Sequence, residues 1–94
     1  MFDIKIAENG DISLSGRWDA SQVEKAQVVF DTIEKSTTVN FKDLEYISSA
    51  GLSVLLGTQK RLSEIDASLK LINLNKYVGD VFRYAGFDAV FDIS

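Results

Sequence analysis

Residues 39–52 read VNFKDLEYISSAGL, and they join a predicted strand to a predicted helix. Val39 and Phe41 alternate with polar residues, which is typical of a strand with one buried face. A short acidic loop follows, and two serines then precede small residues and an apolar helical pattern that begins at Leu52. A strand, a loop and an amphipathic helix in succession are the unit of an α/β domain, so this stretch predicts that fold class.

The same alternation of apolar and polar residues marks strands elsewhere in the chain. Ile12 and Leu14 alternate with serines, and Asn9-Gly10 before them favours a tight hairpin turn after the first strand. The first two strands should therefore pair antiparallel, whereas the later strands connect through helices and should lie parallel. We expect strands at residues 2–6, 12–15, 38–42 and 68–74, and a short last strand at 90–93.

Apolar residues at spacings of three and four predict three amphipathic helices, and Gly86 fits a left-handed cap after the third. The element order is then β-β-α-β-α-β-α, with a short strand after it. Right-handed crossovers that progress in one direction place successive helices on the same face of a sheet. We therefore predict a four- or five-stranded mixed sheet with helices mainly on one face. The expected helices are residues 20–35, 50–65 and 78–85, and the expected polar sheet face carries Lys5, Ser13, Ser15, Asn40 and Lys42.

Length and composition predict a small protein of the cytoplasm. A chain of 94 residues is expected to form one domain over residues 1–94. It has no cysteine, no apolar run that could cross a membrane, and an N-terminus that alternates apolar and charged residues instead of resembling a signal peptide. We expect a monomer or a weak dimer that has no membrane partner.

The residue types that are missing narrow the chemistry further. Without histidine or cysteine, the chain has no Ser-His-Asp or Cys-His arrangement and no imidazole or thiolate metal site. Its net charge is −4 and its lysines and arginines are scattered, whereas nucleic-acid binding needs clustered cations. We therefore expect no catalytic residue, no metal, no cofactor and no nucleic acid, and we interpret the chain as a binding protein that is not an enzyme.

Ser48 and Ser49 stand where the helix of the quoted stretch begins. A serine at this position has its hydroxyl beside free backbone N–H groups and the positive end of the helix dipole, and both favour an anion. The simpler interpretation is an N-cap, for which serine is a preferred residue. Capping alone does not explain Ala50 and Gly51, because glycine weakens a first turn and indicates that another group approaches closely.

Several segments, in their order and spacing, resemble the STAS domain, and in particular the stand-alone anti-sigma factor antagonists of bacteria. The resemblance runs nearly from end to end. The segments are residues 12–16 (ISLSG) leading into Trp18-Asp19-Ala20, residues 41–44 (FKDL), residues 47–52 (ISSAGL) followed by Leu55-Leu56, and residues 84–88 (YAGFD) with Val90-Phe91.

The resemblance implies a switch that is controlled by phosphorylation. In such proteins the unphosphorylated form binds an anti-sigma factor, which is also a serine kinase of the histidine-kinase-like ATPase type, and thereby releases a sigma factor. Phosphorylation of a serine before the second helix ends the binding, and a serine phosphatase resets the protein. On the family's Asp-Ser-Ser-Gly motif, Ser49 is the acceptor, Ser48 takes the Asp position and offers a competing hydroxyl, and Ala50 replaces the second serine.

The resemblance also outlines a partner-binding surface around the acceptor. The loop at Asp19 lies near the acceptor in such domains, although Asp19 also fits a helix cap. Trp18 either closes the core or is an exposed anchor, since tryptophan is frequent at interface hot spots. Asn73 and Asn75 fit a neighbouring loop, and Asn75 equally fits the N-cap of the third helix. The expected partner-binding residues are Trp18, Asp19, Ser48, Ser49, Ala50, Gly51, Leu52, Asn73 and Asn75.

A second interpretation keeps the fold and changes the task. The chain would then be a STAS binding subunit that is not phosphorylated, in a lipid-transport ATPase or in a stressosome-like assembly. Genomic neighbours would separate the two interpretations, since genes for a histidine-kinase-like ATPase and a phosphatase nearby favour the switch.

Overall fold

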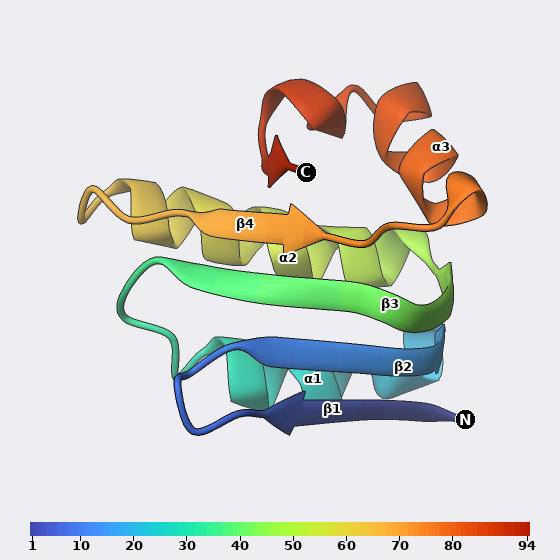
Figure 1. Cartoon of the computed structure of the whole chain (residues 1–94), viewed down its shortest axis with the longest axis horizontal. Helices are drawn as coiled ribbons and strands as arrows, with labels where there is room; N and C mark the ends of the chain where they lie inside the picture. Colours follow the sequence, from blue (N-terminus) through green and yellow to red (C-terminus); the bar gives the residue numbers. More distant parts are fainter.

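The computed structural model describes residues 1–94 and contains a five-stranded mixed sheet (Figure 1). The strands are β1 (Phe2–Ile6), β2 (Ile12–Trp18), β3 (Thr37–Ile47), β4 (Leu69–Ile72) and β5 (Asp92–Ile93). They lie across the sheet in the same order as along the chain. β1 pairs antiparallel with β2, and the later pairs are parallel. The predicted fold class and the mixed sheet are confirmed.

Two helices cover one face of this sheet, and a third lies beyond β4 (Figure 1). The helices are α1 (Val23–Phe30), α2 (Ser49–Ser63) and α3 (Lys76–Tyr84), with 3-10 turns η1 (Ala20–Gln22) before α1 and η2 (Phe87–Ala89) after α3. α1 and α2 lie behind the sheet in this view, which agrees with right-handed crossovers that progress in one direction. None of these helices combines the length and the apolar composition that a membrane crossing requires.

The core lies between the sheet and the helices and forms one cluster of buried apolar side chains. One aromatic part of it is a stack in which the Trp18 ring lies between Phe2 and Phe30, at centre-to-centre distances of 5.2 and 5.8 Å. Stacked rings at such distances add to the stabilisation that comes from burial. The open face of the sheet is polar, as predicted, and carries the exposed Lys5, Ser13 and Lys42 and the half-buried Ser15 and Asn40.

β3 is longer than the sequence pattern predicted. It continues to Ile47 through residues that we expected in a loop, because two register shifts in its pairing with β2 absorb the break in alternation. After these shifts Leu44 and Ile47 are still buried, while Tyr46 pairs with Arg17 on the open side. A β-bulge of this kind re-aims side chains without ending the strand.

α1 and β4 are shorter than predicted, for reasons that lie partly outside them. α1 ends at Phe30 and not near residue 35. Arg61 of α2 donates hydrogen bonds to the backbone oxygen of this last residue (2.9 Å) and to that of Ile33 beyond it (2.8 Å). β4 ends at Ile72, before the left-handed backbone of Asn73 with its φ of 61°. The predicted left-handed cap after α3 is confirmed, since Gly86 has a φ of 76°.

Candidate functional site

The turn between β3 and α2 consists of Ser48, and its hydroxyl caps the helix. Its Oγ accepts a hydrogen bond from the backbone N–H of Gly51 at 3.2 Å, which satisfies one of the free donors of the first turn. Its own backbone N–H donates to the backbone oxygen of Trp18 at 2.9 Å and holds the turn against the end of β2. Ser48 is therefore half-buried, and both its hydroxyl and its backbone N–H already form hydrogen bonds within the chain.

Ser49 is the first residue of α2, and its side chain is exposed. Its hydroxyl forms no hydrogen bond in the structure, whereas the Ser48 hydroxyl acts as the cap. The hydroxyl of Ser49 is therefore free to react, whereas that of Ser48 is held by a hydrogen bond, although the sequence alone does not distinguish the two neighbouring serines. A group added to the Ser49 hydroxyl would extend into solvent at the positive end of the helix dipole.

The close approach predicted at Gly51 comes from within the chain. A Cβ atom at this position would lie 2.9 Å from Ile47 Cγ1 and 3.1 Å from the nearest atom of the Trp18 ring. Glycine lets the first turn of α2 rest directly on the indole of Trp18. Gly51 and Leu52 are both buried, so they shape the site without presenting a side chain to a partner.

The interpretation of Trp18 as an exposed anchor is wrong. Its side chain is 0% exposed, because it is enclosed by the aromatic stack and by the first turn of α2. Its indole Nε1–H finds no acceptor in this enclosure. Trp18 is a support beneath the two serines, and it belongs to the core.

Asp19 has the capping role that the sequence allowed. Its carboxylate accepts hydrogen bonds from the backbone N–H (3.0 Å) and the hydroxyl of Ser21 at the start of η1. The hydrogen bond from the Ser21 hydroxyl is the main cause of a pKa of Asp19 below its ordinary value, so the side chain carries its charge at neutral pH. Asp19 is exposed and directly follows Trp18, whose carbonyl binds the Ser48 turn.

The two asparagines also make defined contacts. Asn75 is the N-cap of α3, because its Oδ1 accepts from the backbone N–H of Val78 at 2.8 Å, and its Nδ2 donates to the backbone oxygen of Leu44 at 3.0 Å. Asn73 donates from Nδ2 to Oδ1 of Asn40 at 3.1 Å. Both side chains remain exposed.

The parallel strands bring these residues to one edge of the sheet. β2, β3 and β4 run in the same direction, so the turns that follow them lie together, on the right in Figure 1. Of the predicted surface, this edge exposes Asp19, Ser49, Asn73 and Asn75 and partly exposes Ser48 and Ala50.

Sequence reasoning missed three residues near this edge. The guanidinium carbon of Arg17 lies 4.5 Å from the centre of the Tyr46 ring, and Tyr46 stacks on Tyr77 of α3 with ring centres 6.2 Å apart and planes 20° from parallel. This row was not predicted because the sequence pattern placed residues 43–46 in a loop, and only the continued pairing of β3 with β2 sets Tyr46 beside Arg17.

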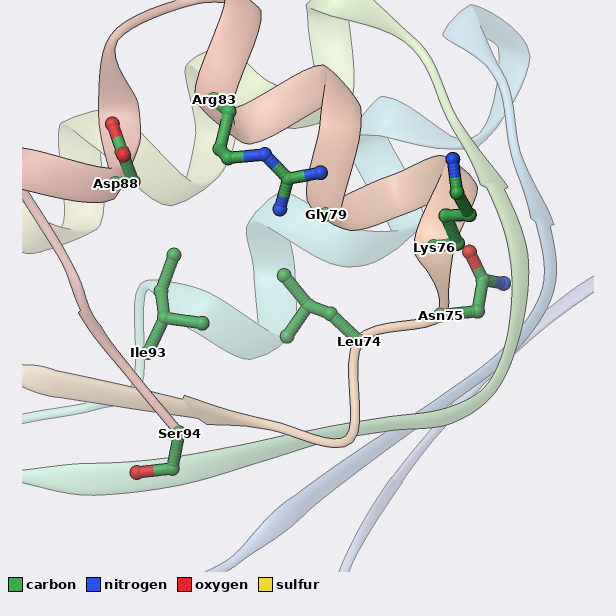
Figure 2. Close-up of a pocket in the computed structure, with 8 residues that line it drawn as sticks. All are labelled: Leu74, Asn75, Lys76, Gly79, Arg83, Asp88, Ile93 and Ser94. Atoms are coloured by element: carbon green, nitrogen blue, oxygen red, sulfur yellow. The ribbon is translucent and has the colours of Figure 1, made fainter.

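A cavity of about 430 Å³ lies elsewhere, between α3 and the end of the chain (Figure 2). Its lining residues are Leu74, Asn75, Lys76, Gly79, Arg83, Asp88, Ile93 and Ser94. Figure 2 shows Arg83 extending from α3 into the hollow, with Leu74 and Ile93 across from it. Arg83 and Lys76 both pair with Asp80, so the cations of this wall already have a partner. Asn75 is the one predicted site residue in its lining, and no group of acidic side chains is arranged to hold a metal ion.

Comparison of the sequence with known proteins gives a consistent set of relatives. A family model described as "Mlab, STAS domain" matches residues 4–92. BtrV of Bordetella bronchiseptica, which is named as an anti-sigma factor antagonist, is 35% identical over 75 residues, and the match covers 80% of this chain and 59% of BtrV. The anti-sigma-B factor antagonist of Staphylococcus aureus is 25% identical over 80 residues, with 81% of this chain and 74% of the relative covered. Both names describe proteins that act on another protein.

Solved structures share the fold over the whole chain. The anti-sigma factor antagonist SpoIIAA in its unphosphorylated form superposes with a TM-score of 0.75 at 20% identity, covering 100% of this chain and 88% of SpoIIAA. SpoIIAA of Bacillus in its phosphorylated form gives a TM-score of 0.72 at 19% identity, with coverages of 100% and 91%. At these identities the similarity establishes the common architecture.

Proposed function

Because the chain belongs to the STAS domain family, we propose that it is an anti-sigma factor antagonist controlled by phosphorylation of Ser49. The unphosphorylated chain binds an anti-sigma factor that is also a serine kinase of the histidine-kinase-like type, and a sigma factor is released. Phosphorylation of Ser49 ends the binding, and a serine phosphatase restores it. ATP and its magnesium ion belong to the kinase.

The observation that carries this proposal is the free, exposed hydroxyl of Ser49 at the first residue of α2. A kinase needs an accessible hydroxyl that no neighbour holds, and the capping role of Ser48 leaves Ser49 in that state. The helix N-terminus also tolerates the dianionic product, because the dipole and the free N–H groups favour an anion. The names of the relatives and the two forms of SpoIIAA support the same assignment.

The test is phosphorylation by a histidine-kinase-like anti-sigma factor from the same genome, with ATP, followed by intact-mass spectrometry. We expect a gain of one phosphate in the wild-type chain, none in Ser49→Ala, and most of the wild-type gain in Ser48→Ala. The Ser48 variant is the matched control, since it removes the neighbouring hydroxyl. Labelling that survives Ser49→Ala and disappears in Ser48→Ala would move the acceptor by one residue and contradict the assignment.

A second candidate is a STAS binding subunit that is not phosphorylated, in a lipid-transport ATPase or a stressosome-like assembly. The observation that favours it is Ser48, because the family motif has an aspartate there and this chain has no carboxylate next to Ser49. Absence of labelling by every kinase of this type in the genome would favour the second candidate over the first.

A further inference from the structure

Arg17, Tyr46 and Tyr77 form a continuous row across three elements, which we call the Arg-Tyr-Tyr ladder. Arg17 lies over one face of Tyr46, and Tyr77 of α3 stacks with Tyr46. The row lies on the open side of the sheet, because Trp18 and Ile47, the next pair along β2 and β3, point into the core. It therefore contributes nothing to the buried cluster.

The ladder leaves its binding groups unused within the molecule. Tyr77 is 51% exposed, and Arg17 is exposed and takes part in no ion pair and no side-chain hydrogen bond. The other arginines are engaged, Arg61 with backbone oxygens and Arg83 with Asp80. The N–H groups of the Arg17 guanidinium make no hydrogen bond within the chain, and the fork of a guanidinium matches the two oxygens of a carboxylate.

The ladder is continuous with the edge that carries Ser49. Ser48 follows Tyr46 by two residues along extended chain, which is about 7 Å. Tyr77 follows Asn75 by two residues, and Asn75 binds the backbone oxygen of Leu44 in β3. A protein that covers Ser49 and extends onto the open face of the sheet would therefore also reach Tyr46.

We propose that the Arg-Tyr-Tyr ladder is a second anchor for the same anti-sigma factor, an assignment that rests on the proposed function. The partner presents a carboxylate to Arg17 and an apolar side chain to the free face of Tyr77. Arginine and tyrosine are enriched among the residues that dominate binding, and a row already stacked in the free chain loses little side-chain freedom on docking. Asp19, Asp43 and Glu45 are exposed and lie within three residues of Arg17 or Tyr46 along the chain, so the rest of the partner's contact surface is basic.

The experiment is calorimetric titration of the kinase that labels the chain, without ATP, into wild type, into Ser49→Asp as a mimic of the phosphorylated form, and into single variants of the ladder. Arg17→Glu and Tyr77→Ala test the ladder. Lys70→Ala removes a cation from the open face near the opposite end of the sheet, and Tyr84→Ala removes a tyrosine of α3 that is 89% exposed and stacks on no ring. These two are the matched controls, and a thermal melt with the emission of Trp18 shows whether each variant is folded.

We expect Arg17→Glu and Tyr77→Ala to weaken binding at least tenfold. Both control variants should bind with an affinity close to that of wild type, and every variant should keep a melting temperature close to that of wild type. If the ladder variants bind as tightly as wild type while Ser49→Asp binds more weakly, the assignment of the ladder as an anchor is wrong and the proposed function still holds. Weak binding by the ladder variants with tight binding by Ser49→Asp would support the ladder and contradict the switch at Ser49. Dimerisation of the wild type that Tyr77→Ala abolishes would overturn the ladder's assignment to the partner in favour of a second copy. No binding to any such kinase would overturn both.

Discussion

At the scale of single residues, the contact between Gly51 and Trp18 sets the geometry of the serine turn. The indole supports the first turn of α2 from below, and the missing side chain at Gly51 lets the turn approach it. Ser48 caps the helix from this position, which leaves the hydroxyl of Ser49 free. The exposed serine therefore depends on a buried glycine and a buried tryptophan.

Gly51→Ala should lower the free energy of unfolding by about 1–3 kcal/mol, as overpacked core positions do. The new methyl group would lie 2.9 Å from Ile47 and 3.1 Å from Trp18, and neither neighbour is a flexible chain end. Urea denaturation followed by Trp18 emission measures the change.

Gly57→Ala is the matched control, because a Cβ atom there meets nothing within 4 Å. This variant in the same helix should gain roughly 0.5–1 kcal/mol from the better helix propensity of alanine. A Gly51 variant that gains stability in the same way would show that the turn does not rest on the indole.

At the scale of elements, one arginine joins the two helices that cover the sheet. Arg61 reaches from α2 to the backbone oxygens of Phe30 and Ile33, where α1 ends. The backbone oxygen of Phe30 belongs to the last residue of α1 and that of Ile33 to the segment after it, and one partly buried guanidinium binds both at once.

Arg61→Ala should lower the free energy of unfolding by about 1.5–3 kcal/mol, which is typical of hydrogen bonds to a charged group. Arg61→Lys should recover only part of the loss, since one ammonium group does not reproduce the planar fork. Denaturant unfolding measures both changes. Lys60→Ala, at the exposed neighbouring residue, should change stability by less than about 0.5 kcal/mol. Equal losses at residues 60 and 61 would contradict a specific role for Arg61.

At the scale of the whole molecule, the proposed switch changes charge while the fold stays the same. A phosphate on Ser49 adds roughly −1.5 to −2 charges, so the formal charge falls from −4 to about −6. Its position at a helix N-terminus favours the anion by about 0.3–1 kcal/mol when exposed. Phosphorylation therefore lowers the affinity for the partner and not the stability of the fold, because a partner surface shaped for a neutral hydroxyl then meets a desolvated anion.

Ser49→Asp should weaken binding to the labelling kinase at least tenfold, which corresponds to about 1.4 kcal/mol. Its melting temperature should stay within a few degrees of wild type, as is usual for a surface change. Ser63→Asp adds the same charge at the last residue of α2 and should keep its affinity. Calorimetric titration and a thermal melt measure both properties. A Ser49→Asp variant that unfolds, or that binds as tightly as wild type, would contradict the proposed mechanism.

The sequence by itself determined the order of strands and helices, the hairpin, the parallel sheet and the position of the two serines at the start of α2. These features depend on local alternation, helical spacing and turn residues such as Gly10 and Gly86, which adopt positive φ in the structure. Neighbouring residues encode them, so a pattern read along the chain is sufficient.

Only the tertiary structure decided which side chains are buried, which remain exposed and which come into contact across different elements. The pairing of β3 with β2 carries Tyr46 past the expected loop, and the packing of α2 on β2 buries Trp18. The Arg-Tyr-Tyr ladder takes one residue from each of β2, β3 and α3. Contacts of this kind depend on register and on the approach of distant elements, and local patterns carry no information about either.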